Sequence, residues 1–188
     1  MKNCLKILGV SETAEREKND FYATDPKAMH LLLEHEQFNK NIWEPACGEG
    51  NLSEVLKEKG YNVYSTDLIN RGYLDDQMDF LKSNNKWFGD IITNPPFKYT
   101  IEFVQKALES IESENKVAMF LKLNYICGVK RYNEIYSKFP PQRIYVFVHR
   151  VACSKNNQKD GFKANAMDYA WFIWEKGKYS PTHLKWIK

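Results

Sequence analysis

Residues 41–56 read NIWEPACGEGNLSEVL, a short apolar run followed by two glycines and then a helical pattern. This order predicts a strand over 41–44, a tight turn at Gly48 and Gly50, and a helix over about 51–59. In an open α/β sheet, glycines at the carboxyl end of a strand let the backbone approach a bound ligand. Such glycine pairs also occur in plain turns, so the pair alone indicates a ligand site only weakly.

The same alternation of strand and helix continues on both sides of this stretch. Upstream, Thr24-Asp25-Pro26 supplies a cap and a first-turn proline for a helix over about 26–38. This order of elements predicts an α/β fold with a mostly parallel central sheet and helices on both faces. Downstream, the patterns predict a helix over about 101–113 and strands over 62–66, 90–93 and 116–121.

The last third of the chain predicts a change of strand direction. A helix near 132–138 and Pro140-Pro141 precede two β-rich runs, 143–149 and 166–174. The polar, basic stretch between these runs has no core pattern, and we expect it to be a long loop that joins a terminal antiparallel hairpin. About a dozen residues follow, too few for a separate recognition domain.

Length and composition predict a single globular domain. The chain has 188 residues, 43% hydrophobic and 27% charged, and we expect one domain over 21–188 behind a mobile or weakly helical lead of residues 1–20. No apolar run reaches the roughly 18 residues of a membrane helix, so we expect a cytoplasmic protein with no membrane contact, monomeric or weakly dimeric. The four cysteines form no CxxC pair, which predicts reduced thiols and no metal site.

Charge is distributed unevenly along the chain. Residues 120–163 carry nine basic and two acidic side chains, a net charge of +7, whereas residues 1–119 carry a net charge of −6. This asymmetry is expected of a protein in which one part holds a small ligand and the other faces phosphates. A solvated surface is the alternative, but it would normally mix the two signs.

Asp67 and the sequence NPPF, residues 94–97, each follow a predicted strand. A carboxylate at the position of Asp67 can accept hydrogen bonds from both hydroxyls of a ribose, although a cap or a surface charge is the alternative. The prolines Pro95 and Pro96 fix the backbone, so that the Asn94 side-chain oxygen and the Pro95 carbonyl can be held toward one bound group. Phe97 would then supply a stacking surface.

Two such acceptors suit the chemistry of an exocyclic adenine amine. This nitrogen is a poor nucleophile because its lone pair is delocalised into the ring. Hydrogen bonds from both amino hydrogens to Asn94 and Pro95 would favour a pyramidal nitrogen whose lone pair faces an electrophile, without a separate base or metal. An ordinary strand-ending turn, which Asn-Pro also favours, is the alternative reading of NPPF.

Five segments together, FYATDP, WEPACGEG, STDL, MDFL and NPPF, resemble the amino-group DNA methyltransferases in their order and spacing. The most similar group is the small phage and prophage-type N6-adenine enzymes, and the resemblance spans about residues 20–175. It implies a Rossmann-like class I methyltransferase fold, S-adenosylmethionine as cofactor, and DNA as partner. The target nucleotide would be turned out of the duplex into the pocket.

The resemblance also implies a role for individual residues. For the cofactor, Tyr22, Thr24 and Asp25 would close over its methionine part, and Asp67 would bind its ribose. The methionine and sulfonium region would be lined by Glu44, Ala46, Gly48 and Gly50, and the adenine moiety would be held by Asp79 and Phe80. In NPPF, Asn94 and Pro95, with Pro96, would polarise the target amine and Phe97 would stack on the base. Phe147 is a candidate for the opposite face of the base, with core packing as the alternative.

The basic segment supplies the expected nucleic-acid contacts. Lys122 and Asn124 follow the strand over 116–121 and would lie beside the pocket. We expect sequence choice to come from loops near 126–142 and 153–166, because the residues after the last strand pair are too few for a separate recognition domain. The side chains available for phosphates are Lys130, Arg131, Lys155, Lys159 and Lys163.

Two other classes of function remain open from the sequence. The same chemistry serves enzymes that methylate a base amine in RNA or a protein glutamine, although glutamine does not demand a basic groove. A catalytically silent nucleic-acid-binding protein would also explain the basic segment, but it would not need Asn94 before two prolines.

Overall fold

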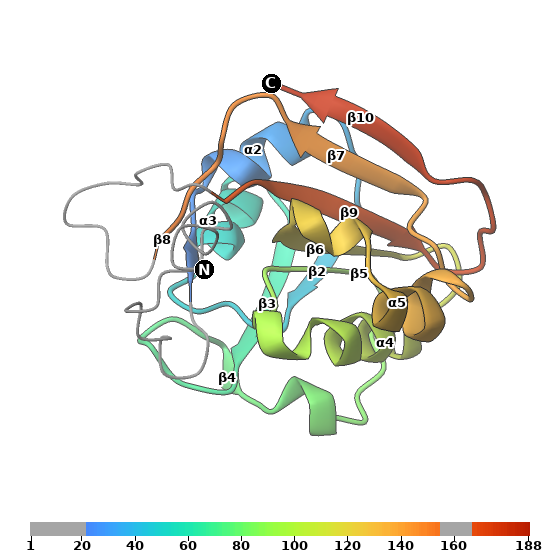
Figure 1. Ribbon diagram of the computed structural model, residues 1–188. Helices are drawn as coiled ribbons and strands as arrows, with labels where there is room; N and C mark the ends of the chain where they lie inside the picture. The colour runs from blue at the N-terminus through green and yellow to red at the C-terminus, as the bar shows by residue number, and fades with distance from the viewer. Residues whose placement is uncertain (1–21, 155–166) are drawn as a thin grey trace, which may run out of the picture.

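The computed structural model describes residues 22–154 and 167–188. Its centre is an eight-stranded sheet in the order β10-β7-β9-β6-β5-β2-β3-β4 (Figure 1). The strands are β2 (Asn41–Glu44), β3 (Asn62–Asp67), β4 (Asp76–Gln77), β5 (Asp90–Thr93), β6 (Lys116–Lys122), β7 (Arg143–Phe147), β9 (Tyr169–Glu175) and β10 (His183–Ile187). β9 runs antiparallel to both of its neighbours, β6 and β7, and the other strand pairs of this sheet are parallel.

Side chains of the central strands alternate between two hydrophobic clusters, one on each face of the sheet. On β6, Ala118 and Phe120 join the first cluster, while Val117, Met119 and Leu121 join the second, and all five are fully buried. A strand that buries both faces reads as a continuous apolar run, as the sequence of β6 does. This explains why its position was predictable from the sequence.

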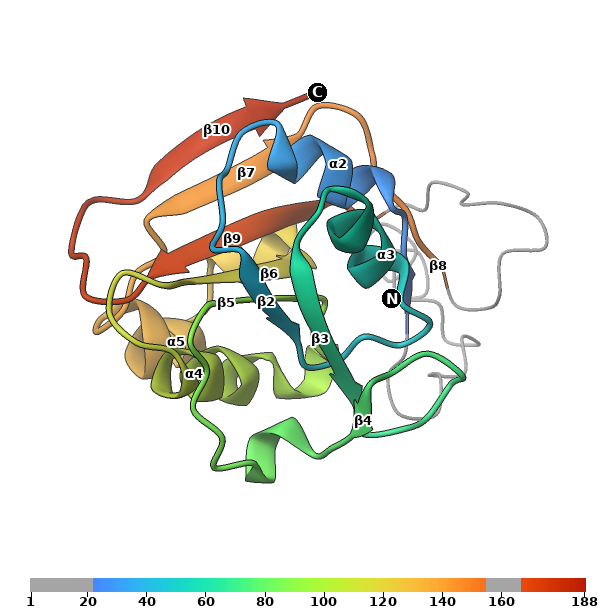
Figure 2. The same cartoon turned by 180° about the vertical axis from the view of Figure 1, so that it is seen from behind.

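Helices cover both faces of the sheet, as predicted (Figures 1 and 2). α2 (Lys27–Leu33) and α3 (Asn51–Glu58) pack their apolar sides into the first cluster. α4 (Thr100–Ser110) packs into the second cluster, as does Ile135 of a π-helical turn, η5 (Tyr132–Tyr136), that follows the short α5 (Val129–Arg131). The part of the chain that the structure describes contains no helix long and apolar enough to span a bilayer.

Two expectations about element boundaries were wrong. The helix predicted over 26–38 ends at Leu33 because the chain turns there and buries the carboxylate of Glu36 against two cations. The antiparallel hairpin was expected to be terminal, but the residues that follow β9 form β10, which adds a parallel strand beyond β7. β7 and β9 do form the predicted antiparallel pair, and two further strands, β1 (Ala23–Thr24) and β8 (Cys153–Ser154), form a separate antiparallel ladder.

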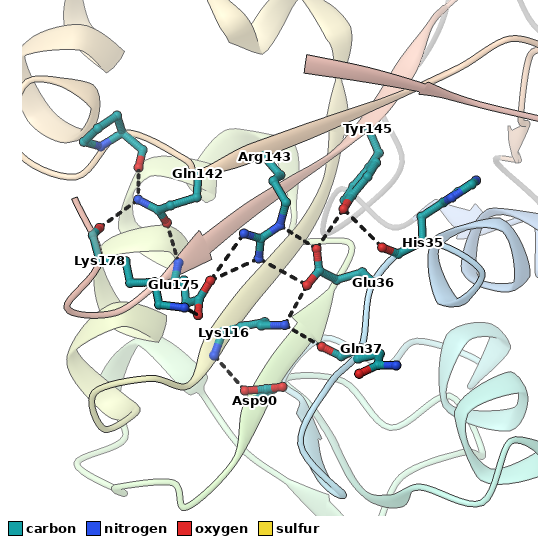
Figure 3. A network of polar contacts seen from close by, with 11 residues as sticks. His35, Glu36, Gln37, Asp90, Lys116, Gln142, Arg143, Tyr145, Glu175 and Lys178 are labelled. Atoms are coloured by element: carbon teal, nitrogen blue, oxygen red, sulfur yellow. Dashed lines mark hydrogen bonds and ion pairs between the residues drawn. The ribbon is translucent and has the colours of Figure 1, made fainter. Parts of the chain in front are cut away.

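The polar cluster around Glu36 ties the amino ends of β5, β6 and β7 together (Figure 3). Lys116 Nζ lies 2.6 Å from Glu36 Oε1, and Arg143 Nε lies 2.6 Å from Glu36 Oε2. The hydroxyl of Tyr145 donates to the same carboxylate at 2.9 Å, and Arg143 also pairs with Glu175 at 3.2 Å. Burial alone would raise the pKa of Glu36, but the hydrogen bonds and charges of Lys116 and Arg143 outweigh it and hold that pKa below its usual value.

Candidate active site

The opposite edge of the sheet, at the carboxyl ends of the parallel strands, carries the predicted functional residues. Glu44 ends β2, Asp67 ends β3, Asn94 follows β5 and Lys122 ends β6. A cavity of about 480 Å³ lies along this edge and is lined by Glu44, Asp67 and the whole NPPF turn, residues 94–97. This is the position at which open α/β sheets bind ligands.

Most residues predicted to hold a cofactor line this cavity. They are Tyr22, Thr24, Glu44, Ala46, Asp67, Asp79 and Phe80. Three others are not among the lining residues. Asp25 accepts a hydrogen bond from the Lys27 backbone N–H at 2.9 Å at the start of α2, and the glycines Gly48 and Gly50 belong to a loop whose other residues line the cavity.

The glycine loop depends on its two glycines for backbone conformation and close contact. Gly48 and Gly50 have φ values of 57° and 85°, in the left-handed region that favours glycine. The Gly48 N–H donates to Asp67 Oδ2 at 2.9 Å, which fixes the loop to the end of β3. A Cβ on Gly50 would lie 2.4 Å from the ring of Tyr73, so the aromatic ring fills the space that only glycine leaves.

Replacing Gly50 by alanine is therefore expected to destabilise the fold more than the same change at Gly72. Both glycines have φ near +85° to +89°, but a Cβ on Gly72 would meet nothing within 4 Å. The pair separates backbone strain, present in both variants, from the clash with Tyr73. We expect Gly50→Ala to lower the free energy of unfolding by about 1–3 kcal/mol more than Gly72→Ala, measured by urea denaturation. Equal losses in the free energy of unfolding of the two variants would show that the Tyr73 ring moves aside at no cost.

Glu44 is a buried carboxyl group that faces the cavity. Its side chain is 1% exposed and accepts a hydrogen bond from Ser53 Oγ, which also lies 2.8 Å from Ser65 Oγ. Burial raises the pKa of Glu44 to about 8, although the hydrogen bond from Ser53 opposes this shift. A cationic ligand group beside Glu44 would lower this pKa again and favour the ionised carboxylate.

Asp67 already uses both of its oxygens within the protein. Oδ2 accepts from Gly48, and Oδ1 accepts from the Ile69 N–H at 2.9 Å and from Arg71 Nη1 at 3.1 Å. A carboxylate has about four acceptor positions, so room remains for a ligand hydroxyl. Sequence reasoning missed Arg71, which also lines the cavity and which no motif singled out.

Asp79 and Phe80 form the far wall of the cavity. Asp79 Oδ1 caps a short 3-10 turn, η2 (Phe80–Lys82), by accepting from the Leu81 N–H at 3.2 Å, and Lys82 pairs with Oδ2 at 3.1 Å. Phe80 is 2% exposed and packs edge-on against Trp43 with ring centroids 5.1 Å apart. Phe80 is therefore anchored in the second hydrophobic cluster, next to the cavity.

Asn94 is held by its side-chain nitrogen. Nδ2 donates to the Thr24 hydroxyl at 2.9 Å and to the Tyr22 carbonyl at 3.2 Å, and it lies 3.4 Å from Cys153 Sγ. Asn94 Oδ1 is buried and has no hydrogen-bond partner among residues 22–154 and 167–188. Leaving a buried acceptor unpaired costs about 1–3 kcal/mol, so such an atom is expected where a ligand donor completes the site.

Phe97 lies in an aromatic group beside Asn94. The Lys122 ammonium sits 4.4 Å from its ring centroid, and the rings of Tyr22 and Tyr169 lie 5.3 Å and 6.2 Å away. Phe147, the candidate for the opposite face of a base, packs on Phe120 in the core and does not line the cavity. Tyr169, which the sequence did not single out, stacks with Phe97.

The predicted nucleic-acid contacts differ in how available they are. Lys130 is exposed and lies 3.9 Å from Glu134, and Asn124 is exposed beside the end of β6. Arg131 instead donates to the carbonyls of Asn124 and Cys127 and stacks on Tyr125 at 4.2 Å, so it organises this loop. Lys155, Lys159, Lys163 and the predicted lead over 1–20 lie outside the described residues.

The cysteines in the described part of the chain, Cys47, Cys127 and Cys153, are free thiols. No group of three or more metal-binding side chains occurs within 22–154 and 167–188. The sequence-based expectation of no metal site therefore stays a prediction for the whole chain.

No protein-family model matches the sequence, and no curated protein matches it either. Solved structures do match the fold. A proposed class I S-adenosylmethionine-dependent methyltransferase from Listeria monocytogenes superposes with a TM-score of 0.60 at 15% identity, over 97% of this chain and 69% of that one. The chain has the Rossmann-like class I methyltransferase fold.

Two further structures share this fold. The M protein of the type I restriction enzyme EcoKI matches with a TM-score of 0.55 at 14% identity, over 81% of this chain but only 42% of its own length. A proposed RNA methyltransferase from Pyrococcus horikoshii matches with a TM-score of 0.55 at 17% identity, over 80% of this chain and 81% of that one. The fold is therefore shared by proteins with different named substrates, and the substrate must be argued from the site.

Proposed function

We propose that the protein transfers a methyl group from S-adenosylmethionine to the N6 amino group of a flipped adenine in DNA. The observation that carries this proposal is the buried, unpartnered Oδ1 of Asn94, a residue that lines the cavity. An acceptor in this position, with Phe97 and Lys122 beside it, suits a planar base that bears an amino group.

The cavity residues fit the cofactor in their chemistry. Glu44 would face the cationic methionine end, Asp67 would accept from the ribose hydroxyls, and Asp79 with Phe80 would hold the adenine moiety. When bound, S-adenosylmethionine supplies a methyl group that leaves a sulfonium centre as an electrophile. The class I methyltransferase neighbours support this cofactor.

The protein's part in the reaction is to orient and polarise the target amine. Asn94 Oδ1 accepts one amino hydrogen, and the Pro95 carbonyl accepts the other. The nitrogen lone pair would then face the methyl group that the bound cofactor would supply, and the proton that the nitrogen loses would pass to solvent. Stabilising the charge that develops on the nitrogen is worth several kcal/mol when the acceptors are already in place.

The choice of DNA rests on charge and on the resemblance of the motifs. Residues 120–163 carry a net charge of +7, and this segment begins beside the cavity at the end of β6. Arg143 of this segment is paired with Glu36 and Glu175 at the other edge of the sheet, so the other basic residues carry the argument. A methyltransferase subunit of a restriction enzyme is among the structures of the same fold. Phosphate contacts from this segment would hold the strand while the base enters the cavity.

A substrate panel tests the nucleic acid. Purified protein is incubated with cofactor labelled in its methyl group and with one substrate in each reaction. The substrates are duplex DNA, single-stranded DNA and ribosomal RNA, in equal nucleotide amounts, and a release-factor protein. We expect label in DNA, most in the duplex. Label confined to RNA or to protein would overturn the choice of DNA and leave the amine chemistry in place.

The pH dependence of cofactor binding tests Glu44. Because the pKa of Glu44 is raised to about 8, its charge is lost as pH falls below that value. Affinity for S-adenosylmethionine should therefore fall by about fivefold from pH 8 to pH 7, as the ionised fraction of Glu44 falls. Glu44→Gln should bind weakly and lose this pH dependence, measured by calorimetry. An unchanged affinity in Glu44→Gln would show that Glu44 does not face the cationic end.

The raised pKa of Glu44 also makes stability depend on pH, but stability falls as pH rises, whereas cofactor affinity rises. The unfolded chain ionises Glu44 near its ordinary pKa of 4.5, whereas the folded protein keeps the proton up to about pH 8. The contribution of Glu44 to the free energy of unfolding is therefore fully present below pH 4.5 and declines as pH rises to 8. Glu44→Gln should lack this decline.

A further inference from the structure

The Asn94 amide nitrogen lies where two distant segments of the chain meet. One segment is β1, with Thr24, and the other is β8, with Cys153. In the antiparallel β1–β8 ladder, Thr24 lies directly opposite Cys153. The Thr24 hydroxyl is 2.9 Å from Asn94 Nδ2, and Cys153 Sγ is 3.4 Å from the same atom.

These contacts allow only one orientation of the Asn94 amide. The Tyr22 carbonyl, 3.2 Å from Nδ2, can only accept a hydrogen bond, so it must face the amide nitrogen. Rotating the amide by 180° would bring Oδ1 against this carbonyl oxygen and leave two acceptors facing each other. The observed orientation leaves Oδ1 as the unpaired atom.

Cys153 is suited to this position as a neutral group. Burial raises the pKa of its thiol to about 11, while hydrogen bonds with Asn94, Tyr169 and Thr24 oppose the shift. The thiol therefore stays protonated near neutral pH. Its sulfur can accept from Asn94, and its S–H can donate to the Tyr22 carbonyl, whose oxygen lies 3.8 Å from Sγ.

We propose that Thr24 and Cys153 are positioning residues, which lock the Asn94 amide with Oδ1 available to the target amine. This inference rests on the proposed function. It assigns Thr24 a role different from the cofactor contact that the motif resemblance implies, although Thr24 also lines the cavity. The β1–β8 ladder thus connects the start of the domain to the reacting group.

The two roles of Thr24 predict different kinetics. Thr24→Val removes the hydroxyl at nearly constant shape, and Thr24→Ser keeps it. If Thr24 positions Asn94, Thr24→Val lowers kcat by about 100-fold with the cofactor Kd unchanged, and Thr24→Ser restores most of kcat. If Thr24 binds the cofactor, the Kd rises instead. Cys153→Ala should lower kcat by about tenfold, and Cys153→Ser should restore part of it.

A second readout does not depend on turnover. The side-chain amide hydrogens of Asn94 can be followed by nuclear magnetic resonance, with the signal identified by its absence in Asn94→Ala. We expect slow exchange with water in the unmodified protein and in Thr24→Ser, and exchange at least tenfold faster in Thr24→Val and Cys153→Ala. Thermal unfolding of each variant shows whether it is folded.

Each outcome decides one of the two claims. Unchanged exchange in both Thr24→Val and Cys153→Ala, or an unchanged kcat with a raised cofactor Kd, would overturn the positioning role. If the unmodified protein methylates none of the offered substrates, the proposed function fails. The exchange rates then still show whether Thr24 and Cys153 lock the amide.

Discussion

Asn94→Ala is expected to lower the rate of methyl transfer by 100-fold to 1,000-fold, while the affinity for S-adenosylmethionine changes by no more than about twofold. The variant removes the acceptor that polarises the target amine. It leaves in place Glu44, Asp67 and Asp79, three residues expected to hold the cofactor that make none of the hydrogen bonds given for Asn94. Single-turnover kinetics with duplex DNA measure the rate, and calorimetry measures the affinity.

Asn84→Ala is the matched control for this change. Asn84 is exposed and does not line the cavity. The Asn84→Ala variant should therefore transfer methyl groups at the rate of the unmodified protein. Asn94 also donates hydrogen bonds to Tyr22 and Thr24. The thermal unfolding midpoint of Asn94→Ala must therefore show that this variant is folded. A folded Asn94→Ala variant with a near-normal rate would show that Asn94 does not polarise the target amine.

Glu36→Gln is expected to lower the free energy of unfolding by about 3–5 kcal/mol. The carboxylate of Glu36 is 7% exposed and accepts from Lys116, Arg143 and Tyr145 at the amino ends of the strands. Glutamine keeps the shape but leaves two cations without their shared anion. Urea denaturation at pH 7 measures the loss, and the cofactor site at the opposite edge should be little affected.

Glu134→Gln is the control for a surface ion pair. Glu134 lies 3.9 Å from Lys130, and both side chains are well exposed, so the change should cost less than about 0.5 kcal/mol. The pH dependence gives a second check. Because the folded pKa of Glu36 lies below 4.5, its stabilising contribution is complete above that value and is lost as pH falls through the folded pKa. A Glu36→Gln loss as small as that of Glu134→Gln would contradict this account.

The central sheet was largely predictable because its strands bury both faces. β5 and β6 appear in the sequence as apolar runs, and the glycine loop marks the start of α3. β10 was not predictable in the same way, since the first four of its five residues are exposed and its sequence, HLKWI, lacks an apolar run. Its position follows from parallel pairing with β7, a long-range contact that local pattern does not encode.

Site residues that belong to a sequence motif could be predicted, whereas those brought to the site only by tertiary contacts could not. Glu44, Asp67 and the NPPF turn line the cavity as expected. Cys153 lies 59 residues from Asn94 in sequence, and no motif links the two. Phe147 was a candidate for the opposite face of the base with core packing as the alternative, and its side chain packs against the first hydrophobic cluster.

The identity of the methylated nucleoside tests the central claim most directly. The purified protein is incubated with duplex DNA and S-adenosylmethionine that carries a deuterated methyl group, and the DNA is digested to nucleosides for mass spectrometry. We predict deuterated N6-methyl-2′-deoxyadenosine, absent from a parallel reaction with Asn94→Ala. Deuterated methyl found only on cytosine, only in RNA or only in protein would contradict the account, as would no transfer by a protein that binds the cofactor.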